Sequence, residues 1–418
     1  MSKELKGACI IGQSGGPTAV INASVLGAVK AALNAPQITR VYGAAHGIRG
    51  VLDQQLYDMG MEDPAELELL KFTPSSALGT CRYKMKNPDE DPSDYEKLLE
   101  TFRRFDVRYF FYNGGNDSMD TCNKISKFMQ KSGYECRVMG IPKTIDNDLF
   151  GTDHCPGFAS AAKYIATSCM EVQHDASCYD TGMITIIEVM GRNAGWLTAA
   201  SALATYAGAG PDLIYLPEVD FDMESFLSDV EKRYNATGKC LVVVSEGIHD
   251  ANGEFISKAT TNSNDGFGHA QLGGLANKLA EVVRSRVPSA KVRAIEPSLL
   301  QRCATHLAST TDATEAYLAG KTAVQAAVSG DTDKMVAFER DTVYGQYVCN
   351  TKLLPLENVA NFEKKVPREW INAAGNGIER DFIDYALPLI QGETGMKTVE
   401  ALPRFARLRK VLAKPVCE

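Results

Sequence analysis

Short apolar runs alternate with longer amphipathic segments along most of the chain, and polar or glycine-rich turns separate them. Apolar runs of about four to eight residues are typical of buried strands, whereas amphipathic segments of about ten or more residues predict helices. The predicted strands cover 8–12, 41–45, 107–112, 137–141, 183–189, 213–216, 241–244 and 292–295. The predicted helices cover 18–33, 95–105, 119–129, 159–177, 197–206, 223–234, 275–286 and 312–328. This alternation predicts mostly parallel sheets with helices on both faces.

The pattern predicts an α/β fold with two doubly wound, Rossmann-like domains of three layers each and an active site in the cleft between them. We expect the first domain to cover 1–157 and to be rejoined by part of 297–341, and the second to cover 158–296. Residues 262–274 are rich in Gly, Asn and Asp and predict a mobile loop. Residues 342–418 are expected to be an extension that packs on the core or makes a subunit contact, without chemistry of its own.

The composition is that of an ordinary soluble protein, with 44% hydrophobic and 23% charged residues in a chain of 418. The formal net charge of −8 and the pI near 5.5 argue against binding to nucleic acid, because nucleic-acid binders normally display a basic surface. An anionic substrate must therefore be attracted by a local cluster of Lys and Arg.

The cysteines and the apolar runs predict the location of the protein. Eleven cysteines are scattered from Cys9 to Cys417 without a CxxC pair, so we expect reduced, mostly structural thiols. Residues 1–7 are short and polar, and no apolar run reaches the roughly 18 residues that a membrane span needs. We therefore expect a cytoplasmic protein that binds neither membranes nor nucleic acid.

Two early turns contain glycines or basic residues. Residues 13–17, with Gly15, lie between a strand and a helix, where backbone N–H groups favour an anion, although such turns also serve only as connections. The small-residue segment 75–84 ends with Arg82 and Lys84. An arginine suits phosphate oxygens there, and a solvated basic loop is the alternative.

The next two strands are followed by the turns 113–118 and 142–149. Asp117 and Ser118 suit helix capping, but capping does not require the two glycines and the asparagine before them. The second turn contains Lys143, Thr144, Asp146 and Asp148. It offers a cation for phosphate, a carboxylate base and a magnesium ligand, whereas a solvated turn is the alternative. Because ligands bind at the carboxyl ends of parallel strands, we expect these turns to converge on one crevice.

The second predicted domain also has charged residues at the ends of its strands. Arg192 and Glu246 follow two of its strands, and Arg293 and Arg302 add two cations in the same region. A single Arg or Glu at a strand end is often structural, so these residues are candidates only in combination with the others.

Together, these turns resemble the motifs of the phosphofructokinase family, and within it the pyrophosphate-dependent branch. The resemblance covers about residues 8–340 and rests on 14–16, 114–118, 142–148, 190–192, Glu246 and 301–302, in the order of the family. The Thr-Ile-Asp sequence at 144–146 and the Met-Gly-Arg sequence at 190–192 are highly specific in combination.

The resemblance implies a phosphotransferase that moves a phosphoryl group reversibly from pyrophosphate to the 1-hydroxyl of fructose 6-phosphate, in glycolysis or gluconeogenesis. Asp146, as the proton acceptor, Lys143, Asp117 and Arg192 are implied as catalytic residues. The residues implied for fructose 6-phosphate are Thr144, Asp146, Met190, Gly191, Arg192, Glu246, Arg293 and Arg302. Gly15, Arg82 and Lys143 are implied for pyrophosphate, and Asn116, Asp117 and Asp148 for Mg²⁺. We also expect a homodimer or a homotetramer.

Two positions bear on the phosphoryl donor. In ATP-dependent members of the family, the residues that correspond to Asp117 and Lys143 are usually glycines, which leave room for the α-phosphate of the nucleotide. Here Asp117 brings bulk and negative charge into that space, and like charges a few ångströms apart cost on the order of 1 to 4 kcal/mol. Lys143 places an ammonium on the smaller donor, so we expect pyrophosphate.

Three residues depart from the family pattern. Asn116 replaces an aspartate near the metal, Met183 replaces an arginine that often reaches a neighbouring subunit's site, and Leu299 replaces a His or Tyr directed at the substrate. The last two leave other sugars open, such as sedoheptulose 7-phosphate.

Three other functions are alternatives. An ATP-dependent phosphofructokinase is the nearest one. A non-catalytic regulatory subunit should have lost its base, yet Asp146 and Lys143 are both present. A nicotinamide-dependent oxidoreductase needs a G-x-G-x-x-G turn, which the first turn lacks.

Overall fold

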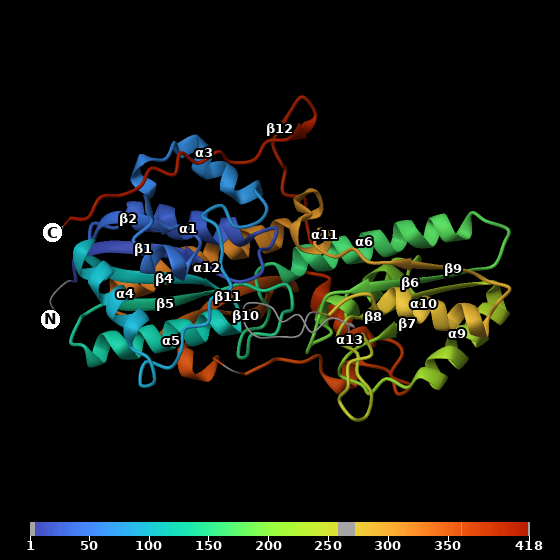
Figure 1. Cartoon of the computed structure of the whole chain (residues 1–418). Coiled ribbons are helices and arrows are strands. Elements are labelled where there is room, and N and C mark those ends of the chain that lie inside the picture. The colour runs from blue at the N-terminus through green and yellow to red at the C-terminus, as the bar shows by residue number, and fades with distance from the viewer. Residues whose placement is uncertain (1–4, 258–271, 361, 417–418) are drawn as a thin grey trace.

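Two sheets with helices on both faces lie side by side in this protein (Figure 1). The computed structural model describes residues 5–257, 272–360 and 362–416. It confirms the predicted α/β fold with two doubly wound, three-layer units. Most of the predicted loop at 262–274 lies outside the described residues.

The larger sheet has seven strands. They are β1 (Gly7–Gln13), β2 (Ile38–Ala44), β3 (Leu56–Asp58), β4 (Val107–Gly114), β5 (Arg137–Pro142), β10 (Lys334–Val343) and β11 (Gln346–Pro355). Their order is β11-β10-β5-β4-β1-β2-β3, and only the edge strands β3 and β11 run antiparallel to their neighbours. Because β11 belongs to this sheet, the chain returns to it beyond the predicted limit at residue 341.

Alternating side chains of the inner strands build a core on each face of this sheet. In β1, Ala8 and Ile10 pack on one face, whereas Cys9 and Ile11 pack on the other. The first face is covered by α2 (Ile48–Leu52), α4 (Ser93–Arg104) and α5 (Asn116–Lys131). The second face is covered by α1 (Ile21–Leu33) and α12 (Thr310–Ser329), and the short helix α3 (Pro64–Leu69) lies beyond them.

The smaller sheet consists of four parallel strands in the order β7-β8-β6-β9. They are β6 (Met183–Val189), β7 (Leu213–Tyr215), β8 (Lys239–Ser245) and β9 (Lys291–Ile295). One face packs against α6 (Phe158–Ser177), α7 (Trp196–Ala199) and α8 (Ala202–Tyr206), and the other against α9 (Met223–Thr237) and α10 (Leu275–Arg286). The predicted helix 197–206 is therefore two short helices. The break lies at Ser201, whose N–H and hydroxyl both bond to the carbonyl of Thr198.

The C-terminal part of the chain contacts both sheets. It contains α13 (Arg380–Ala386) and a small hairpin of β12 (Thr398–Val399) and β13 (Leu402–Pro403). Phe382 and Leu389 are buried in the core on the α6 side of the smaller sheet. The last described residues return to the larger sheet, where Ala413 donates its N–H to the carbonyl of Leu56. Within the described ranges, no helix combines the length and the apolar character needed to cross a membrane.

Candidate active site

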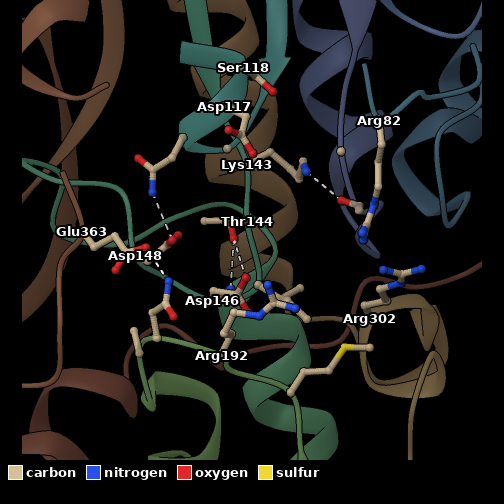
Figure 2. A pocket seen from close by; sticks show the side chains of 18 of the residues that line it. Arg82, Asp117, Ser118, Lys143, Thr144, Asp146, Asp148, Arg192, Arg302 and Glu363 are labelled. Atoms are coloured by element: carbon tan, nitrogen blue, oxygen red, sulfur yellow. Dashed lines mark hydrogen bonds between the residues drawn. The ribbon is translucent and has the colours of Figure 1, made fainter. Parts of the chain in front are cut away.

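A cavity of about 660 Å³ is lined by residues from the carboxyl ends of strands in both sheets. It brings together most of the predicted site residues. These are Gly15, Arg82, Asn116, Asp117, Lys143, Thr144, Asp146, Asp148, Met190, Arg192, Glu246 and Arg302. Figure 2 shows the labelled side chains among them directed toward a common space, for example those of Arg82, Asp146 and Arg192. Gly191 and Arg293 are not among the lining residues.

The first glycine turn is held in place by neighbouring loops. Gly15 has a φ of 75°, in the left-handed region that favours glycine, and its carbonyl accepts the hydroxyl of Thr80 at 2.8 Å. The helix that follows begins at Ile21 and not at the predicted residue 18. The glycines are therefore a separate loop, and the cationic groups next to them are the side chains of Lys143 and Arg302.

Lys143 extends from the end of β5 to this turn. Its ammonium donates to the carbonyl of Gly16 at 2.6 Å, as Figure 2 shows, and its side chain is 3% exposed. Burial lowers the pKa of Lys143 to about 8, partly opposed by the negative charge of Asp146 and reinforced by Arg302. Lys143 therefore places a buried positive charge in the cavity wall next to the glycine turn.

Arg82 and Arg302 add two further cations near Lys143. Arg302 belongs to α11 (Leu300–Cys303), and a Cβ on Gly16 would lie 3.0 Å from its Nη1. Burial lowers the pKa of Arg302, and the charge of Arg82 lowers it further. Because like charges repel in a partly buried space, this cluster is most stable with an anion between its members.

Thr144 and Asp146 form a tight turn directly after Lys143. The hydroxyl of Thr144 accepts the N–H of Asp146 at 3.1 Å, so the turn holds the aspartate by its own backbone. Burial and the negative charge of Glu246 raise the pKa of Asp146 to about 6. A carboxylate with this pKa is mostly ionised at neutral pH and is still basic enough to accept a proton.

A set of side-chain oxygens from Asn116, Asp117 and Asp148 also lines the cavity. Helix α5 begins at Asn116, earlier than the predicted residue 119, so Asn116 and Asp117 lie in its first turn. The amide of Asn116 donates to Asp148 Oδ2 at 3.1 Å, and its buried Oδ1 has no hydrogen-bond partner within the described residues. Burial and the charge of Asp146 raise the pKa of Asp148 to about 7. This set fits a hard divalent cation, which prefers carboxylate and amide oxygens.

The loops of the smaller sheet complete the cavity. Gly191 does not line it, but its N–H donates to Glu246 Oε1 at 3.3 Å and so orients that carboxylate. The hydroxyl of Ser245 donates to the Gly191 carbonyl at 2.5 Å. The N–H of Met190 donates to Gln301 Oε1 at 3.1 Å, which ties this loop to the helix that carries Arg302. Burial raises the pKa of Glu246.

Arg293 lies on β9 and does not line the cavity. It pairs with Asp175 at 2.9 Å, and its guanidinium stacks on Tyr179 at 5.5 Å from the ring centre. Of the two arginines that the resemblance implies for fructose 6-phosphate near the end of β9 and in α11, Arg293 and Arg302, only Arg302 lines this cavity.

The sequence interpretation missed a lining residue from the C-terminal segment. Glu363 lies beside Asp148, and its Oε1 accepts the amide of Asn193 at 2.7 Å (Figure 2). Residues 362–366 have neither helical nor strand periodicity and no motif, so the sequence held no signal for this placement. The tail, which was expected only to pack on the core or to make a subunit contact, therefore also contributes a side chain to the lining of the cavity.

Comparison with known proteins identifies relatives over almost the whole chain. The chain is 43% identical over 402 residues to the pyrophosphate–fructose 6-phosphate 1-phosphotransferase of Halomonas elongata, covering 95% of each protein. It is 45% identical over 414 residues to the protein of the same name from Xanthomonas campestris, covering 97% of each. The crystal structure of a pyrophosphate-dependent phosphofructokinase from Marinobacter aquaeolei superposes with a TM-score of 0.86 at 40% identity and covers 98% of both chains.

The family model described as phosphofructokinase matches residues 8–329. This range contains the glycine turn, Lys143 with the Thr-Ile-Asp sequence, and the loops that carry Arg192 and Glu246. The chain therefore belongs to the phosphofructokinase family.

Proposed function

We propose that this protein transfers a phosphoryl group from pyrophosphate to the 1-hydroxyl of fructose 6-phosphate and releases fructose 1,6-bisphosphate and phosphate. One observation carries the choice of donor. The buried ammonium of Lys143 donates to Gly16 at the glycine turn, and Asp117 lines the same cavity. Both residues stand where ATP-dependent members usually have glycine. The names of the relatives that match over the whole chain support the same donor.

In the proposed reaction, Asp146 accepts the proton of the sugar hydroxyl as that oxygen attacks the phosphorus. Such general-base assistance contributes roughly two to four powers of ten in rate. Arg82 and Lys143 balance the charge of the transferring phosphoryl group and of the departing phosphate, and Arg192 approaches the same space. Arg302 holds the 6-phosphate of the sugar. Glu246 accepts hydrogen bonds from sugar hydroxyls.

Phosphofructokinases generally depend on a divalent metal. We propose Mg²⁺ here, held by Asn116, Asp117 and Asp148 together with oxygens of the substrate. The unpartnered Oδ1 of Asn116 and the two carboxylates supply oxygen ligands only, and Mg²⁺ commonly takes one or two carboxylates plus substrate phosphates. When bound, the ion neutralises part of the charge on pyrophosphate.

An assay with each donor in turn tests this function. The purified protein is incubated with fructose 6-phosphate, Mg²⁺ and either pyrophosphate or ATP, and fructose 1,6-bisphosphate is measured. We expect product with pyrophosphate and little or none with ATP. Product with ATP alone contradicts the choice of donor, and no product with either donor favours a regulatory subunit. Sedoheptulose 7-phosphate in place of fructose 6-phosphate tests the sugar.

Two further properties accompany this proposal. The cysteines that the structure describes are free thiols, which agrees with the proposed cytoplasmic location. The homodimer or homotetramer stays a prediction, and light scattering after size exclusion tests it.

A further inference from the structure

The loop that follows Asp146 is held by the C-terminal segment of residues 362–389. Asn147 stands between the proposed base and the proposed metal ligand Asp148, so its backbone sets the direction of both carboxylates. It is fully buried and has a φ of 55°, in the left-handed region that a side chain other than glycine adopts only with support from its surroundings. This support comes from hydrogen bonds to both the oxygen and the nitrogen of the Asn147 side-chain amide.

One end of the Asn147 side chain bonds within its own loop. Its Oδ1 accepts the N–H of Cys155 at 2.9 Å. The other end leaves the loop, because Nδ2 donates to the hydroxyl of Tyr385 on α13 at 2.8 Å. That hydroxyl in turn donates to the carbonyl of Asp153 at 2.8 Å. The hydroxyl of Tyr385 thus uses its one proton on Asp153 and one of its lone pairs on Asn147, both in the loop that follows Asp146.

The ring of Tyr385 is fixed independently of this hydroxyl. It packs 5.3 Å from the ring of Trp196 and 5.3 Å from that of Trp370, measured between ring centres. The guanidinium of Arg340 lies 4.8 Å from the centre of the same ring and donates to the Tyr385 carbonyl at 3.0 Å. Tyr385 is therefore a rigid support, not a mobile side chain that happens to meet the loop.

Lys364 gives the same segment a second attachment to the loop. Its N–H donates to the Asp148 carbonyl at 2.8 Å, and its ammonium donates to the Asp153 carbonyl at 2.7 Å. Its own carbonyl accepts the indole N–H of Trp196 at 2.8 Å. The carbonyl of Asp153 is thus held by both Tyr385 and Lys364.

We infer that Tyr385 is a positioning residue for phosphoryl transfer, which acts through Asn147 on the placement of Asp146 and Asp148. It does not line the cavity, so it does not touch the substrate. This inference rests on the proposed function, because the role of Asp146 comes from it. A small displacement of a reacting group slows an oriented reaction strongly, whereas substrate contacts made by other residues are retained.

The test compares Tyr385→Phe with Tyr134→Phe, and wild-type turnover with fructose 6-phosphate and pyrophosphate is measured first. Tyr134 is a matched control because its hydroxyl also serves backbone carbonyls, those of Phe102 and Val107, away from the cavity. We expect Tyr385→Phe to lower kcat about tenfold or more while KM for each substrate stays within about twofold. Tyr134→Phe should keep kcat, and the two variants should lose a similar amount of melting temperature.

The outcomes separate the possible failures. If the wild type itself is inactive, the proposed function fails, whereas an active wild type with an unchanged kcat in Tyr385→Phe overturns the inference alone. The double variant with Asn147→Gly, which keeps the left-handed backbone available, should show the kcat of Asn147→Gly alone. If the fold-losses of kcat in the two single variants multiply in the double variant, Tyr385 does not act through Asn147. Should Tyr385→Phe not fold, Asn147→Gly must lower kcat similarly, and an unchanged kcat there overturns the inference.

Discussion

The turns at the strand ends and the C-terminal segment contribute to the site in different ways. The turns after β4, β5, β6 and β8 supply charged groups that face the cavity, whereas the turn after β1 supplies its glycines. The segment 362–389 supplies mainly contacts to those turns, through Tyr385 and Lys364, and only Glu363 enters the cavity. The charged groups of the site therefore lie mainly in short turns with recognisable sequences, whereas the positions of these turns depend on contacts with a segment that has no such sequence.

Removal of the proposed base is the strongest test of the turns. Asp146→Asn should lower kcat by roughly two to four powers of ten, because the amide cannot accept the proton. Burial disfavours the charged form of Asp146 and raises its pKa to about 6, so the neutral amide should leave the melting temperature at pH 7 unchanged or higher. Steady-state kinetics and thermal denaturation measure both effects. Substantial turnover in this variant would place the base elsewhere.

The two donor positions are the next test. Asp117→Gly combined with Lys143→Gly should lower kcat/KM for pyrophosphate by about a hundredfold, because the buried ammonium at the glycine turn is lost. The same double variant should gain measurable turnover with ATP. Each single variant serves as a control for the contribution of the other position. Unchanged kinetics with pyrophosphate would contradict the donor assignment.

The pH dependence probes the same turns without mutation. Asp146, with a pKa of about 6, must be ionised to accept a proton, so kcat/KM should fall as the pH decreases below about 6. Lys143, with a pKa of about 8, must be protonated to bind pyrophosphate, so kcat/KM should also fall as the pH increases above about 8. Each limb should approach a tenfold change per pH unit. A flat profile between pH 5 and pH 9 would exclude both assignments.

The smallest expected effect lies in the C-terminal segment. Lys364→Met keeps the length of the buried side chain. It leaves the carbonyl of Thr152 without its side-chain donor and that of Asp153 with the Tyr385 hydroxyl alone, at a cost of about 1–3 kcal/mol in unfolding free energy. Because the N–H of Lys364 still holds Asp148, kcat should fall only a few fold. Urea denaturation and steady-state assays check both numbers. A loss of activity as large as that of Asp146→Asn would mean that this segment takes part in the chemistry itself.

Much of the site was predictable because its turns follow hydrophobic strands. Parallel strands place their carboxyl ends at one edge of a sheet, so Asp117 and Lys143 of the larger sheet line one cavity. Glu246 follows a strand of the smaller sheet, whose carboxyl ends face the same cavity. The starts of α1 and α5 were less predictable, because small polar residues such as Thr18 and Asn116 suit both a loop and the first turn of a helix. Boundaries of this kind depend on tertiary contacts.

The contributions of Glu363 and Tyr385 were not predictable from the pattern. Glu363 enters the cavity because the backbone at residues 363 and 364 pairs with Leu149 and Asp148 in the loop that follows Asp146. In the sequence pattern, Tyr385 is indistinguishable from an aromatic residue that only packs in the core. Arg293 shows the opposite case: its position near a strand suggested a site residue, yet it pairs with Asp175 outside the cavity.

The most direct test of the central claim is a competition between the two donors in one sample. Fructose 6-phosphate, Mg²⁺, pyrophosphate and ATP are mixed with the enzyme, and ³¹P NMR follows all phosphorus species over time. We predict that the pyrophosphate signal decays while inorganic phosphate and the 1-phosphate of fructose 1,6-bisphosphate increase together, with ATP unchanged. Formation of ADP with pyrophosphate left intact would contradict the account.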